Sequence, residues 1–170
     1  MALGKRKYFD VVLLCLTLLF YVLFLVESRN PLIVDDVHPE AFCNTTIQKA
    51  DVLYIIPFYN GKWIDNDENW CHQIKNLNKI IGLHGIRHTY HEFDHTINES
   101  ELDRAVTAVG NCVGNKSLFF RPPYNLISKE NEEKIKRLNM TIYKERYFTH
   151  PYCHCHPQSY MKLLNWILLC

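Results

Sequence analysis

The sequence predicts an α/β protein in which parallel strands alternate with helices, preceded by one N-terminal transmembrane helix. Three observations support this fold class. An uncharged apolar run fills residues 11–26, short apolar runs rich in β-branched residues recur through the rest of the chain, and stretches with apolar residues at helical spacing separate them. Strands that alternate with helices of this length form right-handed βαβ units, and these units give a parallel sheet.

Composition narrows the classes of protein that the chain can belong to. The 170 residues contain 19 Lys and Arg against 18 Asp and Glu, a net charge of +1. A nucleic-acid-binding protein needs a concentrated basic surface to neutralise phosphates, so this class is excluded. With 48% hydrophobic and 22% charged residues, the chain has the composition of a folding protein, and its length allows one globular domain.

The N-terminal apolar run is the predicted membrane helix. Lys5, Arg6 and Lys7 precede it, and Val11–Val26 contains no charge. This run is shorter than the roughly 20 residues that a spanning helix needs, although the two aromatic residues at positions 8 and 9 extend it. An uncleaved signal anchor is favoured. A cleaved signal peptide is the alternative, but only Ser28 offers a small residue for the cleavage site.

The basic residues before the run predict a cytosolic N-terminus. Residues 1–30 would then form a cytosolic tail and signal anchor, and residues 31–170 a luminal or extracellular domain. Two features fit this single-pass topology. Four N-x-[ST] sequons, typical of glycoproteins, begin at Asn44, Asn98, Asn115 and Asn139. Six cysteines follow Cys15, and they allow disulfides whose pairing the sequence does not give, with buried free thiols as the alternative: Cys43, Cys71, Cys112, Cys153, Cys155 and Cys170.

In the first half of the domain, Asp51–Pro57 is the clearest strand, because it is a short, almost continuous apolar run. Pro39 fits the first turn of a helix, and Asn60-Gly61 marks a turn. The residues Trp70, Ile74 and Leu77 stand near helical spacing. The predicted elements are strands over residues 31–35, 51–57 and 80–84 and helices over residues 39–50 and 68–79.

In the second half, Leu102, Val106 and Val109 form a helical stripe that Gly114 would end. Ser128 is a good N-cap residue, and Glu residues fill the turn that follows, so a helix is expected to begin here. The predicted elements are helices over residues 99–113, from residue 128 onward and over residues 157–169, and strands over residues 117–121, 141–144 and, more weakly, 152–155.

Polar residues of metal-binding type stand where the predicted strands end. Asp35-Asp36 ends the first strand, His84 ends the third with His88 soon after, and Arg121 ends the fourth. Parallel sheets place ligand sites at the carboxyl ends of their strands, and two imidazoles with one carboxylate suit zinc or another divalent cation. Where the chain turns, both carboxylates can face the site, so that one holds metal and the other accepts a proton from water. Arg121 can fork onto this second carboxylate.

These residues resemble the motifs of the polysaccharide deacetylase (NodB-homology) superfamily, and most nearly its DUF2334 branch. Val34-Asp35-Asp36-Val37 is similar to the family's paired-Asp motif, and His84 and His88, with Gly85 after the first, match its His-x-x-x-His step. Phe120–Tyr124 matches its Arg-x-Pro-aromatic segment. The three motifs follow the family's order over about residues 32–127.

The resemblance implies metal-assisted hydrolysis of an acetyl or similar acyl group on a carbohydrate. It assigns the metal, for which zinc is favoured, to Asp36, His84 and His88. Asp35 would be the general base, Arg121 would orient it, and the backbone N–H at Tyr124 would stabilise the oxyanion. For the general acid three histidines compete, and His156 is preferred over His150 and His154.

The family's fold is a distorted (β/α) barrel of about seven strands. Since the chain shows five or six, we expect a small or incomplete barrel. The general-acid motif is not cleanly matched, so a catalytically inactive, glycan- or metal-binding glycoprotein of the same fold is the alternative. A third candidate is an anchored interaction protein that binds no metal. The expected partners are a carbohydrate and a membrane, with no nucleic acid, and the oligomeric state stays open.

Each site residue also has a simpler explanation. Asp35-Asp36 can cap the helix that follows, and His84 and His88 can belong to a polar loop. Arg121 can form a surface ion pair, and residues 150–156 can form a separate metal site or disulfides. Two aromatic residues near the site can stack on a sugar ring: Tyr59 and Trp63.

Overall fold

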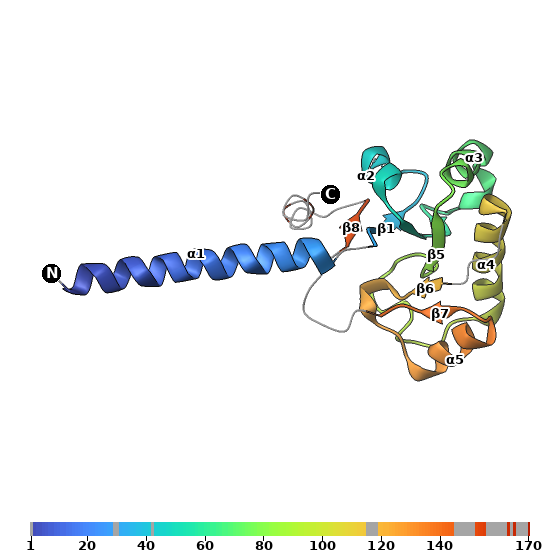
Figure 1. Ribbon diagram of the computed structural model, residues 1–170. Coiled ribbons are helices and arrows are strands. Elements are labelled where there is room, and N and C mark those ends of the chain that lie inside the picture. The colour runs from blue at the N-terminus through green and yellow to red at the C-terminus, as the bar shows by residue number, and fades with distance from the viewer. Residues whose placement is uncertain are drawn as a thin grey trace.

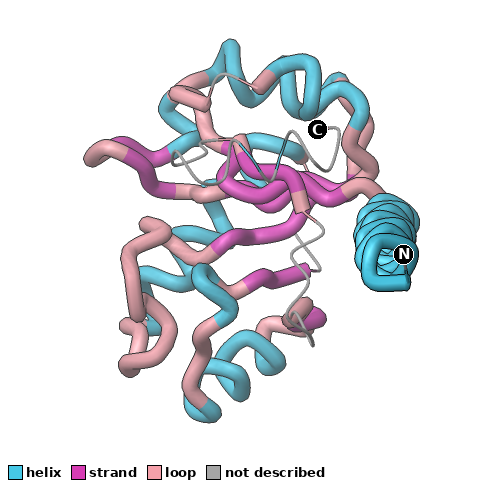
Figure 2. Tube along the Cα trace, turned by 90° about the vertical axis from the view of Figure 1, so that its left-hand side faces the viewer, coloured by secondary structure: helices cyan, strands magenta, loops and turns pink. Residues whose placement is uncertain are grey.

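A six-stranded sheet forms the centre of the computed structural model, which describes residues 2–28, 31–41, 43–114, 119–144, 152–155, 163, 165 and 170. The strand order is β7-β6-β5-β2-β1-β8, and every neighbouring pair is parallel. The predicted parallel sheet with alternating helices is confirmed, and β7 and β8 are its edges, so the described strands form an open sheet (Figures 1 and 2). The strands are β1 (Ile33–Val37), β2 (Val52–Ile55), β5 (Ile80–His84), β6 (Phe119–Arg121), β7 (Thr141–Ile142) and β8 (Cys153–His154).

Four helices follow the strands as crossovers. In Figure 1, α3 and α4 lie side by side along the strands, and α5 lies beside β7. Side chains from the central strands, such as Val34, Leu53 and Leu83, and from the helices, such as Val109 and Ile135, form one buried apolar core. The helices are α2 (Asn44–Lys49), α3 (Glu68–Asn76), α4 (Glu99–Val113) and α5 (Lys129–Arg137), with short 3-10 turns η1 (Ile64–Asn66) and η2 (Pro123–Asn125).

Single residues in the sequence correctly predicted where two of the helices begin or end. Helix α4 ends at Gly114, whose φ of 80° lies in the left-handed region, as predicted for a glycine stop. Ser128 caps α5 by accepting a hydrogen bond from Asn131 N. The predicted helix over residues 39–50 is wrong in its first part, because the chain turns at His38–Ala41 and α2 begins only at Asn44. The predicted helix over residues 157–169 falls almost entirely outside the described residues.

The turn at Asn60-Gly61 belongs to an antiparallel hairpin that the sequence analysis did not predict as strands. Its strands, β3 (Phe58–Tyr59) and β4 (Lys62–Trp63), contain only two residues each. Two-residue strands are too short to show the alternation by which strands are identified.

The six cysteines of the domain form three disulfides, so they are not buried free thiols. The pairs are Cys43–Cys155, Cys71–Cys112 and Cys153–Cys170. Cys71–Cys112 joins α3 to α4, and the other two bonds hold the residues on either side of His154.

Helix α1 (Ala2–Ser28) extends away from the sheet (Figure 1). Its segment Lys7–Phe24 is long and apolar enough to cross a membrane, and none of it is buried against the rest of the chain. A signal sequence has the same properties.

Gly82 in β5 is expected to be essential for packing. A Cβ atom at Gly82 would lie 2.3 Å from a ring carbon of the buried Tyr54 in β2. We therefore expect Gly82→Ala to lower the free energy of unfolding by about 1–3 kcal/mol, the usual cost of overpacking. Gly110→Ala is the matched control, because nothing lies within 4 Å of its added Cβ in α4, and alanine favours a helix. Denaturant unfolding of both variants measures this, and equal stabilities would contradict the packing argument.

Candidate metal centre and active site

A bulge in β1 brings both aspartates into one site. In a regular strand, adjacent side chains point to opposite faces. Here Asp36 has a φ of 61°, and the register of β1 against β2 shifts between Val34 and Val37. Both carboxylates are buried and meet groups at the ends of β5 and β6. The predicted strand over residues 31–35 is too short at its carboxyl end, because β1 continues to Val37. The bulge, and not a turn after the strand, therefore brings both carboxylates to the site.

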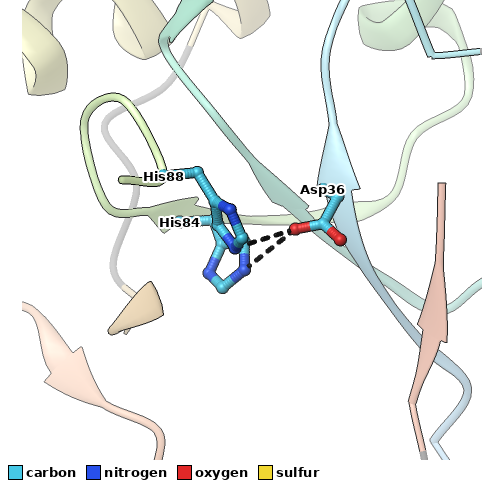
Figure 3. A group of neighbouring side chains, drawn as sticks. All are labelled: Asp36, His84 and His88. Carbon is cyan, nitrogen blue, oxygen red and sulfur yellow. Dashed lines mark ion pairs between the residues drawn. The ribbon is translucent and has the colours of Figure 1, made fainter. Parts of the chain in front are cut away.

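Asp36, His84 and His88 converge on one point. Asp36 Oδ1 lies 3.4 Å from His84 Nε2 and 3.0 Å from His88 Nε2 (Figure 3). One ligand atom from each residue lies within 4.8 Å of the others. His84 ends β5 and His88 follows in the next turn, so the predicted convergence of these side chains is confirmed.

The donor set fits a divalent cation. His84 Nδ1 lies 3.0 Å from the carbonyl oxygen of Arg121, which can only accept a hydrogen bond, so Nδ1 carries the proton and Nε2 faces Asp36. Metal-binding histidines are usually oriented by such a bond. Asp36 Oδ1 is buried, and within the described part of the chain no hydrogen bond satisfies it. Two imidazoles therefore face one carboxylate oxygen that has no hydrogen bond, and this is the set of donor residues found in zinc sites.

The charges of the site also suit a cation. Burial opposes ionisation of Asp36, but its hydrogen bond with His154 Nδ1 and its close approach to the imidazole of His84 outweigh burial and hold the pKa of Asp36 well below the usual value. Burial, together with the charge of His84, lowers the pKa of His88 to about 4, so this imidazole is neutral at pH 7. Burial opposes the charged form of His84, but the nearby Asp35 and Asp36 raise its pKa, so a proton competes with a cation for this residue.

Asp35 and Arg121 form a buried ion pair. Arg121 Nε donates to Asp35 Oδ2 at 2.7 Å, and its guanidinium carbon lies 3.7 Å from the ring centroid of Tyr152. The expected fork is wrong, since the pair is joined by this one hydrogen bond. Asp35 Oδ1 is buried and has no hydrogen-bond partner among the described residues, which leaves it able to accept a proton. The surface-pair and helix-cap alternatives are wrong, because Arg121 is buried and Cys43 is the N-cap of α2.

A sequence model of the polysaccharide deacetylase family matches residues 43–143. The chain belongs to this family. The matched segment contains His84, His88 and Arg121, and it begins after the bulge that carries Asp35 and Asp36. None of the curated proteins searched matches the chain.

Solved structures of family 4 carbohydrate esterases share the fold. A polysaccharide deacetylase from Bacillus cereus is 13% identical, with a TM-score of 0.55 over 81% of this chain and 84% of its own. A Streptomyces lividans esterase in complex with acetate is 15% identical, with a TM-score of 0.50 over 65% of this chain and 59% of its own. A pseudoenzyme of this family from Bacillus anthracis is 13% identical, with a TM-score of 0.53 over 82% and 59%. The chain spans little more than half the length of several of these relatives, and it covers 54% of a peptidoglycan N-acetylglucosamine deacetylase.

Of the three general-acid candidates in this deacetylase-family domain, the structure brings His154 to the site. His154 Nδ1 lies 2.7 Å from Asp36 Oδ2, and β8 pairs with β1 so that His154 stands beside Asp35. Its backbone N–H and carbonyl are both held by the side chain of Asn165. The preferred candidate, His156, and the runner-up, His150, lie outside the described residues.

Two exposed tyrosines lie beside the candidate metal centre. Tyr124 follows β6 with a φ of 54°, is 46% exposed, and its ring lies 5.0 Å from that of His88. Tyr90, which the sequence analysis missed, is 67% exposed and lies 5.1 Å from the ring of Tyr124. The role of the Tyr124 N–H stays a prediction. The two aromatic residues named earlier pack within the protein, Tyr59 on His38 and Trp63 on Phe58 and Arg104.

Proposed function

We propose that the chain is a membrane-anchored, metal-dependent hydrolase that removes an acetyl or similar acyl group from a carbohydrate. The observation that carries the proposal is the convergence of Asp36, His84 and His88 beside Asp35, whose carboxylate Arg121 holds, in a polysaccharide deacetylase domain. Each of these residues comes from the carboxyl end of a parallel strand or the turn after it, where α/β folds bind their ligands.

Asp36, His84 and His88 would hold the cation, for which zinc is favoured. When bound, it would polarise the acyl carbonyl and lower the pKa of a water molecule toward neutrality. Asp35 Oδ1 would take a proton from the attacking water, because Arg121 fixes the other oxygen of this carboxylate. The Tyr124 N–H would donate to the oxygen that becomes negative.

The general acid must deliver a proton to the leaving amine. His154 is held against Asp36 by its Nδ1 atom and is the candidate with a described position in the site. His156 stays the alternative. Replacing each by Gln and comparing the basic limbs of the pH–rate profiles would separate them, because loss of the acid removes that limb.

Tyr90 and Tyr124 would stack on a sugar ring whose acyl group enters the metal centre. Tyr90→Ala should raise KM several-fold and leave kcat nearly unchanged, because an exposed ring contributes binding shared by substrate and transition state. Tyr90→Phe keeps the ring and should resemble the natural protein. Steady-state kinetics on an acetylated oligosaccharide measures both, and a fall in kcat with constant KM would contradict this role.

Helix α1 would anchor the domain, with the N-terminus in the cytosol and residues 31–170 in a lumen or outside the cell. The basic residues Lys5–Lys7, which precede the uncharged run of this helix, support this topology, as do the three disulfides and the sequons. The asparagines Asn44, Asn98 and Asn139 are exposed in the structure. Protease added to sealed microsomes should leave residues 31–170 intact. Their digestion without detergent would refute the topology.

An inactive, glycan- or metal-binding protein is the second candidate, and the similarity to a pseudoenzyme of the same fold favours considering it. The full chain, loaded with zinc, should release acetate from an acetylated chito-oligosaccharide and lose this activity on addition of a chelator. Metal and oligosaccharide binding without acetate release would support the inactive protein instead. A folded chain with no stoichiometric metal would refute the hydrolase and any metal-binding role.

A further inference from the structure

A single carboxylate accepts hydrogen bonds from the backbone of the turn that joins His84 to His88. Glu92 accepts hydrogen bonds from three consecutive N–H groups: from Ile86 N at 3.1 Å and His88 N at 3.2 Å through Oε2, and from Arg87 N at 2.7 Å through Oε1. These residues connect His84 to His88. The position of His88 therefore depends on a side chain that is not itself among the three converging ligands.

The turn needs this support, because its backbone is strained. His88 has a φ of 57°, a left-handed conformation that is costly for a residue with a Cβ atom and persists only where the surroundings impose it. Gly85 has a φ of 65°, and a Cβ there would lie 2.6 Å from Glu92 Oε2 and 2.3 Å from Pro123 Cγ. The Glu92 carboxylate thus packs directly on the turn, in space that only glycine leaves open.

Glu92 is itself fixed to the core. The next residue, Phe93, is 1% exposed, and its ring lies 4.7 Å from that of Phe120 in β6. The carbonyl of Phe93 accepts hydrogen bonds from Ser128 N and from the side chain of Asn131. A continuous series of contacts therefore runs from the core and α5 through Glu92 to the imidazole of His88.

From this geometry we propose that Glu92 is a positioning residue that holds His88 Nε2 toward Asp36 Oδ1 and so sets the affinity of the site for its cation. The inference rests on the proposed function, because it concerns the same metal site. Residues that orient metal ligands typically change metal affinity roughly 10–100-fold when they are replaced.

The test is the zinc affinity of the full chain in detergent, measured by competition with a chromophoric chelator. Glu92→Gln keeps the length of the side chain but replaces one acceptor oxygen by a donor group that opposes the N–H groups of the turn. We expect its affinity to fall roughly 10–100-fold, and the cobalt-loaded protein to show an altered visible spectrum. Asp94→Asn is the matched control, because this half-exposed carboxylate in the same segment pairs with His91, and its affinity should not change.

Glu92→Asp keeps the charge but is one methylene shorter, and an affinity between those of the natural protein and Glu92→Gln is expected. If Glu92→Gln does not fold, the zinc affinity of Glu92→Asp tests the proposal. A folded Glu92 variant that binds zinc as tightly as the natural protein would overturn the proposal. The proposal would also fail if the substitution lowered the Tm equally with and without metal and left the zinc affinity unchanged. A natural chain that binds no zinc would refute the metal site itself. Zinc binding that is insensitive to Glu92 would refute this inference alone.

Discussion

Replacing Asp35 by Asn should lower the rate of deacetylation by roughly 10²–10⁴-fold, the usual contribution of a general base, while the metal stays bound. Asp35 is not among the three converging ligands, and its buried Oδ1 is the oxygen left to accept a proton. Acetate release and the metal content of the same sample measure the two effects. Turnover near that of the natural protein would exclude Asp35 as the base.

The same substitution should also destabilise the fold. It removes the negative partner of Arg121, and breaking a buried ion pair from one side typically costs about 3–5 kcal/mol. Kinetics should therefore be measured well below the Tm of the variant. The double variant Asp35→Asn with Arg121→Gln, which removes both charges, should recover part of the stability without recovering turnover.

His84→Ala should abolish both metal binding and turnover. His84 supplies one of three converging atoms, and its other ring nitrogen is held by the carbonyl of Arg121, so the remaining pair offers an incomplete site. Elemental analysis should find less than stoichiometric metal, and added zinc should not restore activity at concentrations that saturate the natural protein. His91→Ala is the matched control, because His91 is outside the converging group and pairs with Asp94. Stoichiometric metal in His84→Ala would remove the basis of the proposed site.

The sequence predicted which residues of the candidate metal centre lie together, because parallel strands bring their carboxyl ends to one edge of the sheet. Once β1, β5 and β6 were recognised as strands, Asp36, His84 and Arg121 had to lie near one another. The short apolar runs at these strands and the stripe of α4 were sufficient signals, and β5 and α4 have the predicted bounds.

Other features depend on contacts that no local pattern shows. The bulge at Asp36 uses a positive φ in a residue other than glycine, so no glycine marks it. His154 reaches Asp36 across 118 positions through the pairing of β8 with β1, and a two-residue strand gives no periodicity by which to choose it over His156. The bracketing of His154 by two cysteines was the available signal. Glu92 was missed because one acidic residue in a polar turn looks like an ordinary solvated side chain.

The bonds Cys43–Cys155 and Cys153–Cys170 bracket His154 on a strand of two residues. The position of His154 in a sample therefore depends on whether the protein was produced under conditions that allow these disulfides to form. Apart from any glycans on the sequons, chain made in a reducing cytoplasm and chain made through an oxidising secretory route would differ in mass by only six hydrogen atoms. Under the proposed function, the reduced chain would bind a cation but would lack an imidazole fixed beside Asp36. An assay of such material would then report no activity for a reason other than the sequence of the protein.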